Sequence, residues 1–252
     1  MSIEILDPSG DVIRTLDPEE LGLDAGLNRV NWDLSMDPPE LRKEKDDDFI
    51  EFGGGPRGPM VLPGVYRVRL TLDGQSQEAP VEVTVDPLIE ATDADLRAQF
   101  EAATELWTMA SYLGRSLRGL DILAEQLEAR KQILEKMDRR PSEETVAAWK
   151  AHEDKARDLM LLLARDEAKP RWSEGPQLLD RIDDLFRNID GQFAAPTVAQ
   201  KEHLQELETD YGEAVAELER WLTTDLPELN RLLEAEGIPK VVLPELVGEV
   251  TR

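Results

Sequence analysis

The spacing of apolar residues changes once along this chain, and that change restricts the fold more than any other feature. Over residues 27–85 apolar and polar side chains alternate on either side of a long charged, glycine-rich stretch, whereas from Asp93 onward apolar residues recur every three or four positions. Alternation is typical of half-buried strands, and three-four spacing is typical of amphipathic helices. The sequence therefore predicts a multi-domain α+β chain, with a β-module at residues 1–90 and a helical module behind it.

The first 90 residues predict short antiparallel strands. Residues 2–6 and 12–16 flank an Asp-Pro-Ser-Gly turn, and further alternating runs follow at residues 27–34, 65–72 and 81–85. Five short strands with one apolar face each predict two sheets packed face to face, a β-sandwich with Trp32 in its core. The apolar face expected for the fourth strand consists of Tyr66, Val68, Leu70 and Leu72.

A long insert, residues 35–64, interrupts this module. It holds a Pro-Pro pair, a charge cluster at residues 43–48 and a glycine- and proline-rich end. Loops of this length in a small domain are usually functional or disordered. We expect a contact loop in which Arg57, Phe49 and Phe52 meet a partner. The glycine-rich end is not a phosphate-binding loop, because no Lys-Ser/Thr pair and no helix follow it.

Residues 91–240 predict an antiparallel bundle of three or four long helices. Apolar residues from Ala103 to Leu134 follow three-four spacing, which predicts one helix of about 45 residues beginning at Asp93. Residues 241–252 are predicted to be an extended apolar tail that docks on another part of the chain, with the β-module as one candidate.

Local signals divide the rest of the helical module. Residues 141–142 end the first helix and cap a second, whose buried stripe is expected to include Val146. Pro176 begins a short third helix that ends at Gly191. A capping box at residues 197–200 begins a fourth. Pro227 is expected to kink or restart this last helix before Gly237 ends it.

Charge excludes one class of partner. Acidic residues outnumber basic ones by 54 to 29, which gives a net charge of −25. A field of this sign repels phosphate backbones, so we expect no nucleic-acid partner. Few of the basic residues are lysines, and this composition favours a halophilic or salt-tolerant source. No apolar run is long enough to span a membrane. Residues 1–20 lack the features of a signal peptide, and the immediate start of a strand suggests a piece of a longer protein.

No residues are predicted to be catalytic, to bind a cofactor or to bind a metal. The chain has no cysteine, and its two histidines, His152 and His203, fall on different predicted helices. Paired carboxylates such as Asp183 and Asp184 lie where a solvated helix face is expected. Four tryptophans are interpreted as packing residues rather than as a sugar-stacking platform: Trp107, Trp149, Trp172 and Trp221.

Three segments resemble the immunoglobulin-like (Ig-like) module of flagellar hook-capping proteins: IEILDPSGDVIRTL, GLNRVNWDL and LPGVYRVRL. Trp32, Asp33, Pro63, Gly64 and Tyr66 occupy the packing and turn positions that recur in that family. The resemblance implies that the predicted sandwich is Ig-like.

With the insert and the helices included, the whole chain resembles the C-terminal region of large bacterial sialidase-like or sortilin-like β-propeller proteins, which are often labelled glycosyl hydrolases. Residues 194–200 and 223–239 match the helix start and the helical finish of that region. The Asp-box repeats of the propeller are absent, so a glycosidase activity of the family does not transfer to these residues. The family implies a secreted or periplasmic setting, and the compartment of this chain stays open.

These observations lead to one expected function and two alternatives. The first is a non-catalytic accessory region that buttresses a β-propeller or docks a partner protein. The second is a carbohydrate-binding or accessory part of a secreted glycosyl hydrolase, for which a glycan is the partner. The third is a self-assembling structural protein of the hook-capping type.

Overall fold

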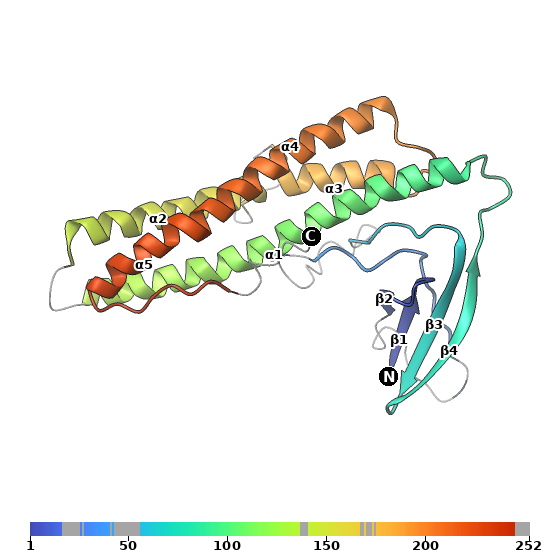
Figure 1. The fold of residues 1–252 in the computed structure, drawn as a ribbon, viewed down its shortest axis with the longest axis horizontal. Helices are drawn as coiled ribbons and strands as arrows, with labels where there is room; N and C mark the ends of the chain where they lie inside the picture. Colours follow the sequence, from blue (N-terminus) through green and yellow to red (C-terminus); the bar gives the residue numbers. More distant parts are fainter. Residues whose placement is uncertain are drawn as a thin grey trace. The chain divides into compact units, whose positions relative to one another are not determined.

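The computed structural model describes residues 1–16, 26, 28–40, 42, 56–136, 141–166, 169, 173 and 175–244. The protein is a mixed α+β chain with one four-stranded antiparallel sheet in its described part (Figure 1). In chain order the elements are β1 (Ser2–Leu6), β2 (Val12–Leu16), β3 (Gly64–Leu72), β4 (Gln75–Val83), α1 (Asp93–Lys136), α2 (Glu143–Leu163), α3 (Leu178–Ile189), α4 (Val198–Arg220), a π-helical turn (Trp221–Asp225) and α5 (Leu226–Ala235).

The chain divides into two compact units that are each discontinuous in sequence. The sheet unit comprises residues 1–39, 46–107 and 186–200, and the helical unit comprises residues 40–45, 108–185 and 201–252. This division differs from the predicted boundary near residue 90. The first turns of α1 belong to the sheet unit, because the Trp107 indole N–H donates to the Asp37 carbonyl oxygen at 2.9 Å and Gln99 accepts the Ala194 N–H at 3.2 Å.

The sheet has the strand order β2-β1-β3-β4, with every pair antiparallel. The hairpin of β1 and β2 turns at Asp7, whose carboxylate accepts the Gly10 and Asp11 N–H groups. The hairpin of β3 and β4 turns at Asp73 and Gly74, which both have left-handed backbone conformations. Such a pair fits a two-residue turn that matches strand twist. The predicted Asp-Pro-Ser-Gly turn is therefore confirmed, and an Asp-Gly pair forms the second one.

The strand predicted at residues 27–34 is wrong for its described part, residues 28–34. These residues join no ladder, and Ser35 forms only an isolated bridge with Met60. The Asp33 carboxylate accepts both the N–H and the hydroxyl of Ser35, at 3.1 and 2.6 Å, and Leu34 has a φ of 61°. Local side-chain bonds of this kind compete with strand pairing. The described residues therefore contain one sheet and no second sheet packed on it.

Loop residues cover the sheet instead. The core cluster of this unit consists of Ile5, Val61 and Tyr66, and Trp32 packs against it with its ring edge-on to Tyr66 at 5.6 Å between centroids. Trp32 packs on the core, as expected, but it lies on a loop and not on a strand. Leu70 and Leu72 were expected in the core but are 40% and 52% exposed. Both lie at the C-terminal end of β3.

The long first helix is confirmed: α1 has 44 residues. Its predicted seam is buried at every turn from Ala103 to Leu127 except at Ala124, which is half-buried. Two predicted caps are confirmed: Ser142 caps α2, and Thr197 and Gln200 form the capping box of α4. A further capping box, formed by Thr92 and Asp95, starts α1. Val146 is 49% exposed, so the expected stripe of α2 was wrong at that position.

Helices of the helical unit contact one another through paired side chains. Lys131 on α1 meets Glu153 on α2 at 3.2 Å, and Arg181 on α3 meets Asp210 on α4 at 2.6 Å. Tyr112 on α1 packs edge-on against Tyr211 on α4, with ring centroids 5.9 Å apart. In Figure 1, α2 and α5 run beside each other, consistent with their contacts.

Pro227 follows a π-helical turn between α4 and α5, at the place where a kink or restart was predicted. The Leu226 N–H donates to the Trp221 carbonyl oxygen, five residues back instead of four. Because proline has no N–H and its ring clashes with the carbonyl four residues earlier, the widened turn accommodates it without ending the helix. Gly237 ends α5 with a φ of 75°, and the Ile238 N–H donates to the Leu233 carbonyl oxygen.

The described part of the tail binds helices of its own unit. The Asn230 side chain donates to the Val241 carbonyl and accepts the Val241 N–H, at 2.9 and 2.7 Å. Gln126 on α1 makes the same pair of bonds with Val242, both at 2.8 Å. The tail therefore docks on α1 and α5, and the suggestion that it returns to the sheet was wrong for these residues.

Candidate functional site

The insert begins and ends at a neck formed by residues 34–36 and 59–61. The Met36 N–H donates to the Pro59 carbonyl oxygen at 2.9 Å, and the Val61 N–H donates to the Leu34 carbonyl oxygen at 2.8 Å. Gly58 is required beside this neck, because a Cβ there would lie 2.2 Å from the Asp37 carbonyl oxygen. The two ends of the insert are therefore held together by backbone bonds.

Arginines of α1 hold the N-terminal flank of the insert within the helical unit. The Glu40 carboxylate accepts from Arg115 at 2.7 Å and from Arg118 at 2.5 Å. Arg42 forms a two-point ion pair with Asp121, at 2.8 and 2.5 Å. Two-point arginine–carboxylate pairs fix orientation as well as position. Residues 40 and 42 are thus fixed against one face of α1.

The environment of Glu40 favours its charged form. Partial burial by itself raises the pKa of the Glu40 carboxyl, but the hydrogen bonds and charges of Arg115 and Arg118 outweigh it. The net pKa of Glu40 lies below the ordinary value of 4.5. Glu40 remains 47% exposed, so water screens much of this attraction.

A buried carboxylate holds the C-terminal flank of the insert within the sheet unit. Asp190, next to the end of α3, is 1% exposed. One of its oxygens accepts the Met60 N–H at 2.9 Å, and the other lies 3.1 Å from the Arg57 guanidinium, an ion pair whose geometry falls short of a hydrogen bond. The Asp190 side chain therefore contacts two residues of the insert, Arg57 and Met60.

Burial dominates the electrostatics of Asp190. Desolvation raises the pKa of the Asp190 carboxyl above the ordinary 3.8, and the Met60 N–H and the Arg57 charge offset this only in part. A carboxylate at the C-terminal end of a helix also faces the unfavourable end of the helix dipole. The next residue, Gly191, has a φ of 76°, and a Cβ there would lie 3.4 Å from Arg57.

The three residues expected to contact a partner have different outcomes. Arg57 lies on the surface beside the neck, pairs with Asp190 and remains 45% exposed. Phe49 and Phe52 lie outside the described residues. Contact of any of the three with a partner stays a prediction.

An open apolar cleft of about 230 Å³ lies in the sheet unit beside the neck. Its walls come from the neck, the end of β4, the start of α1 and the loop after α3, and include Leu34, Val61, Val83, Leu96 and Phe193. Three polar side chains line it as well: Thr84, Asp86 and Gln99. A concave apolar surface with few polar groups is the usual form of a binding site.

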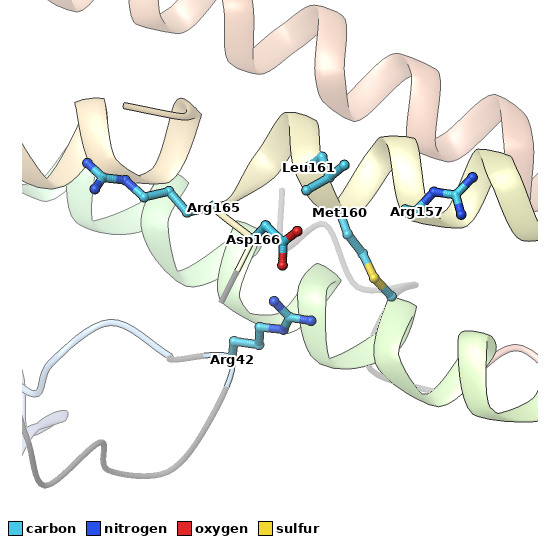
Figure 2. Close-up of a pocket in the computed structure, with 6 residues that line it drawn as sticks. All are labelled: Arg42, Arg157, Met160, Leu161, Arg165 and Asp166. Carbon is cyan, nitrogen blue, oxygen red and sulfur yellow. The ribbon is translucent and has the colours of Figure 1, made fainter. Parts of the chain in front are cut away.

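A second pocket, in the helical unit, has a different chemistry. Arg42, Arg157 and Arg165 line it together with Met160, Leu161 and Asp166. Figure 2 shows the Arg42 guanidinium below the Asp166 carboxylate, while Arg157 and Arg165 point away in opposite directions. Carboxylates already neutralise these arginines: Asp121 for Arg42, Asp154 for Arg157 and Asp180 for Arg165. We therefore assign no anion site here.

His152, Trp149 and Trp221 take structural positions. Both ring nitrogens of His152 face backbone carbonyl oxygens, those of Ala148 and Asp225, at 2.8 and 3.1 Å. Trp149 and Trp221 are buried as predicted, whereas Trp172 lies outside the described residues. Within the described ranges, no group of three or more potential metal-ligating side chains lies together. No described helix is both long and apolar enough to cross a membrane.

Sequence reasoning missed Asp190, Gln99 and Phe193. A signal existed for two of them. Asp190 continues the apolar stripe of Ile182 and Phe186 at four-residue spacing, and Gln99 falls one step before Ala103 in the seam of α1. A polar residue on an apolar stripe is more informative than one on a solvated face. Phe193 gave no signal, because its importance lies in a backbone conformation.

Comparison of the chain with models of known protein families, with curated proteins and with solved structures found no match.

Proposed function

We propose that this chain is a non-catalytic interaction region that docks a partner protein, with a β-propeller of the sialidase-like or sortilin-like kind as the partner that the sequence resemblance suggests. The observation that supports this most is the fixation of the insert at both flanks. Charge-assisted bonds hold residues 40 and 42, the neck closes the loop, and Asp190 binds residues 57 and 60.

Fixed flanks suit binding better than the flanks of an ordinary connection do. A partner that meets fixed residues loses less conformational entropy on binding than one that must first order them. Arg57 is available for such a contact, since nearly half of its side chain is exposed while one of its nitrogens pairs with Asp190. Arginine is enriched at protein interfaces.

The proposal includes the finer architecture that the sequence suggests. In this reading the sheet unit is a member of the Ig-like class and the helices form an antiparallel bundle that supports the propeller. The motifs containing Trp32, Asp33, Pro63, Gly64 and Tyr66 support the first part. The contacts between α1, α2, α3 and α4 support the second.

The test replaces residues 43–55 with a Gly/Ser linker of equal length and measures binding to a purified sialidase-like β-propeller domain by calorimetry. We expect an unchanged melting temperature and a Kd at least tenfold weaker. The variant Arg57→Ala should weaken binding by about threefold to tenfold, as truncation of an interface arginine commonly does.

A matched control is Arg231→Ala, which removes an exposed arginine of α5 that pairs only with Glu228 of its own helix among the contacts seen. Its Kd should equal that of the wild type. A wild-type chain that does not bind the propeller, or a linker variant with an unchanged Kd, would refute the docking function. Binding to a glycan array that the linker variant loses would support the carbohydrate alternative instead.

A further inference from the structure

We infer that the apolar cleft of the sheet unit binds a protein segment that inserts one apolar side chain and places a lysine or arginine beside it. This inference rests on the proposed interaction function and deepens it, because it names the chemistry of a contact separate from the insert. Four observations in the sheet unit support it: the shape of the cleft, backbone strain at its rim, one buried amide and the charge around it.

The rim of the cleft has an unusual backbone. Among the described residues only Leu34, Asp73 and Phe193 combine a side chain with a positive φ, and Asp73 is explained by its hairpin turn. The other two both line the cleft, with φ of 61° and 53°. Bulky residues rarely adopt this conformation, which costs about 1–3 kcal/mol. The fold therefore tolerates strain at two places where a large apolar side chain borders the cleft.

Both strained residues remain accessible. Leu34 is 38% exposed and Phe193 is 36% exposed, although each is large and apolar. Leu88, on the β4–α1 connection that also supplies Asp86 to the cleft, is 89% exposed. Strain that buries a side chain would improve the core, whereas here it leaves apolar surface in contact with water. This arrangement fits a surface that another molecule covers.

Gln99 supplies a polar group inside the cleft. It is 4% exposed and lines the cleft, and its carbonyl oxygen accepts the Ala194 N–H at 3.2 Å. That bond fixes which end of the amide is oxygen. The two N–H donors at the other end are then what Gln99 offers to a bound group. Backbone carbonyl oxygens of a peptide segment are acceptors of the required kind.

The charge around the cleft selects a basic partner. Residues 81–95, which run from the end of β4 into α1, contain five acidic residues and no basic residue: Glu82, Asp86, Glu90, Asp93 and Asp95. Asp86 itself lines the cleft, and its carboxylate also accepts the Leu88 N–H at 2.8 Å. An acidic segment would be repelled by this surface and by the net charge of −25. A lysine or arginine next to the inserted side chain would pair with Asp86.

A random heptapeptide phage library, selected against the whole chain, provides the probe. We expect the enriched peptides to share an apolar residue adjacent to lysine or arginine. The synthesised consensus peptide should then shift the side-chain amide signals of Gln99 in the ¹H–¹⁵N spectrum. Its Kd is measured by calorimetry for the wild type and for three variants.

Phe193→Gly removes the rim side chain, and the packing that is lost is offset in part because glycine adopts a φ of 53° at little cost. We expect its Kd to be about tenfold weaker, the usual loss for an interface aromatic. Asp86→Asn keeps an acceptor for the Leu88 N–H and removes the charge, so its Kd should weaken about threefold at low salt and less at high salt. Leu72→Ser, an exposed apolar position on β3 outside the cleft, is the control with an unchanged Kd.

Each contrary result is distinct. If Phe193→Gly leaves the Kd unchanged, the proposed binding site in the cleft is refuted, and the docking function of the insert is not affected. Enriched peptides that are acidic, or that lack an apolar residue, would overturn the chemistry assigned to the partner, and a selection without enrichment would overturn the site. A wild-type dimer in light scattering that Phe193→Gly converts to a monomer would show that a second copy occupies the cleft. Failure of propeller binding would count only against the proposed function.

Discussion

Glu40 and Asp190 hold the two flanks of one insert, and they do so in opposite surroundings. Glu40 is about half exposed and meets two arginines, so its pKa is lowered. Asp190 is buried and has one arginine and one N–H as partners, so desolvation prevails and its pKa is raised. A carboxylate can therefore hold the flank of a loop in two ways. An exposed carboxylate does so by charge, and water screens that attraction; a buried carboxylate does so by hydrogen bonding, and the cost of burying its charge opposes folding.

The largest expected effect is at Asp190. Asp190→Ala leaves the Met60 N–H without an acceptor beside a newly formed cavity. We expect the free energy of unfolding to fall by about 2 kcal/mol, the usual cost of a buried donor without a partner. Urea unfolding followed by circular dichroism measures this change. Asp190→Asn is the matched control, because its side-chain oxygen still accepts the Met60 N–H. If both variants lose the same stability, the hydrogen bond is not what holds this flank.

The next effect is the pH dependence of Asp190. Because the folded pKa is raised, the folded state binds more protons than the unfolded state between the ordinary value of 3.8 and the folded pKa. The contribution of Asp190 to stability is therefore full below pH 3.8 and is lost as pH rises through the folded pKa. We expect wild type to gain stability relative to Asp190→Asn as the pH falls from neutral toward 4, in paired urea titrations. A difference that stays constant would contradict the raised pKa.

The smallest effect is at Glu40, and it has the opposite sign. Because the folded pKa is lowered, the contribution of Glu40 is present above the ordinary value of 4.5 and is lost as pH falls through the folded pKa. At neutral pH we expect Glu40→Gln to lose less than about 1 kcal/mol, since the carboxylate is half exposed. Molar salt should reduce this loss, and it should leave the effect of Asp190→Asn largely unchanged. Equal salt sensitivity of the two variants would remove the distinction between them.

Local patterns were sufficient wherever a helix or hairpin depends on neighbours in sequence. The 44-residue helix, the capping box of Thr197 and Gln200 and the turn at Asp73 and Gly74 all follow from the residues themselves. The alternation of apolar and polar residues around Trp32 led to the wrong prediction of a strand. Alternation indicates that one face is buried, but it does not say whether a strand or a loop carries that face. Trp32 does pack on the sheet core, but the bonds of Asp33 with Ser35 direct the backbone away from strand pairing.

The sequence by itself determined the class of the protein, the extent of its helices and the existence of a long insert, because these depend on spacing, turn residues and proline positions. Only the tertiary structure decided which residues matter at the insert and the cleft. Asp190 lies more than a hundred residues from its partners Arg57 and Met60, and Gln99 is similarly distant from Ala194. Pairing over such distances is set by how the elements pack, and it leaves in the sequence only a polar residue on an apolar stripe.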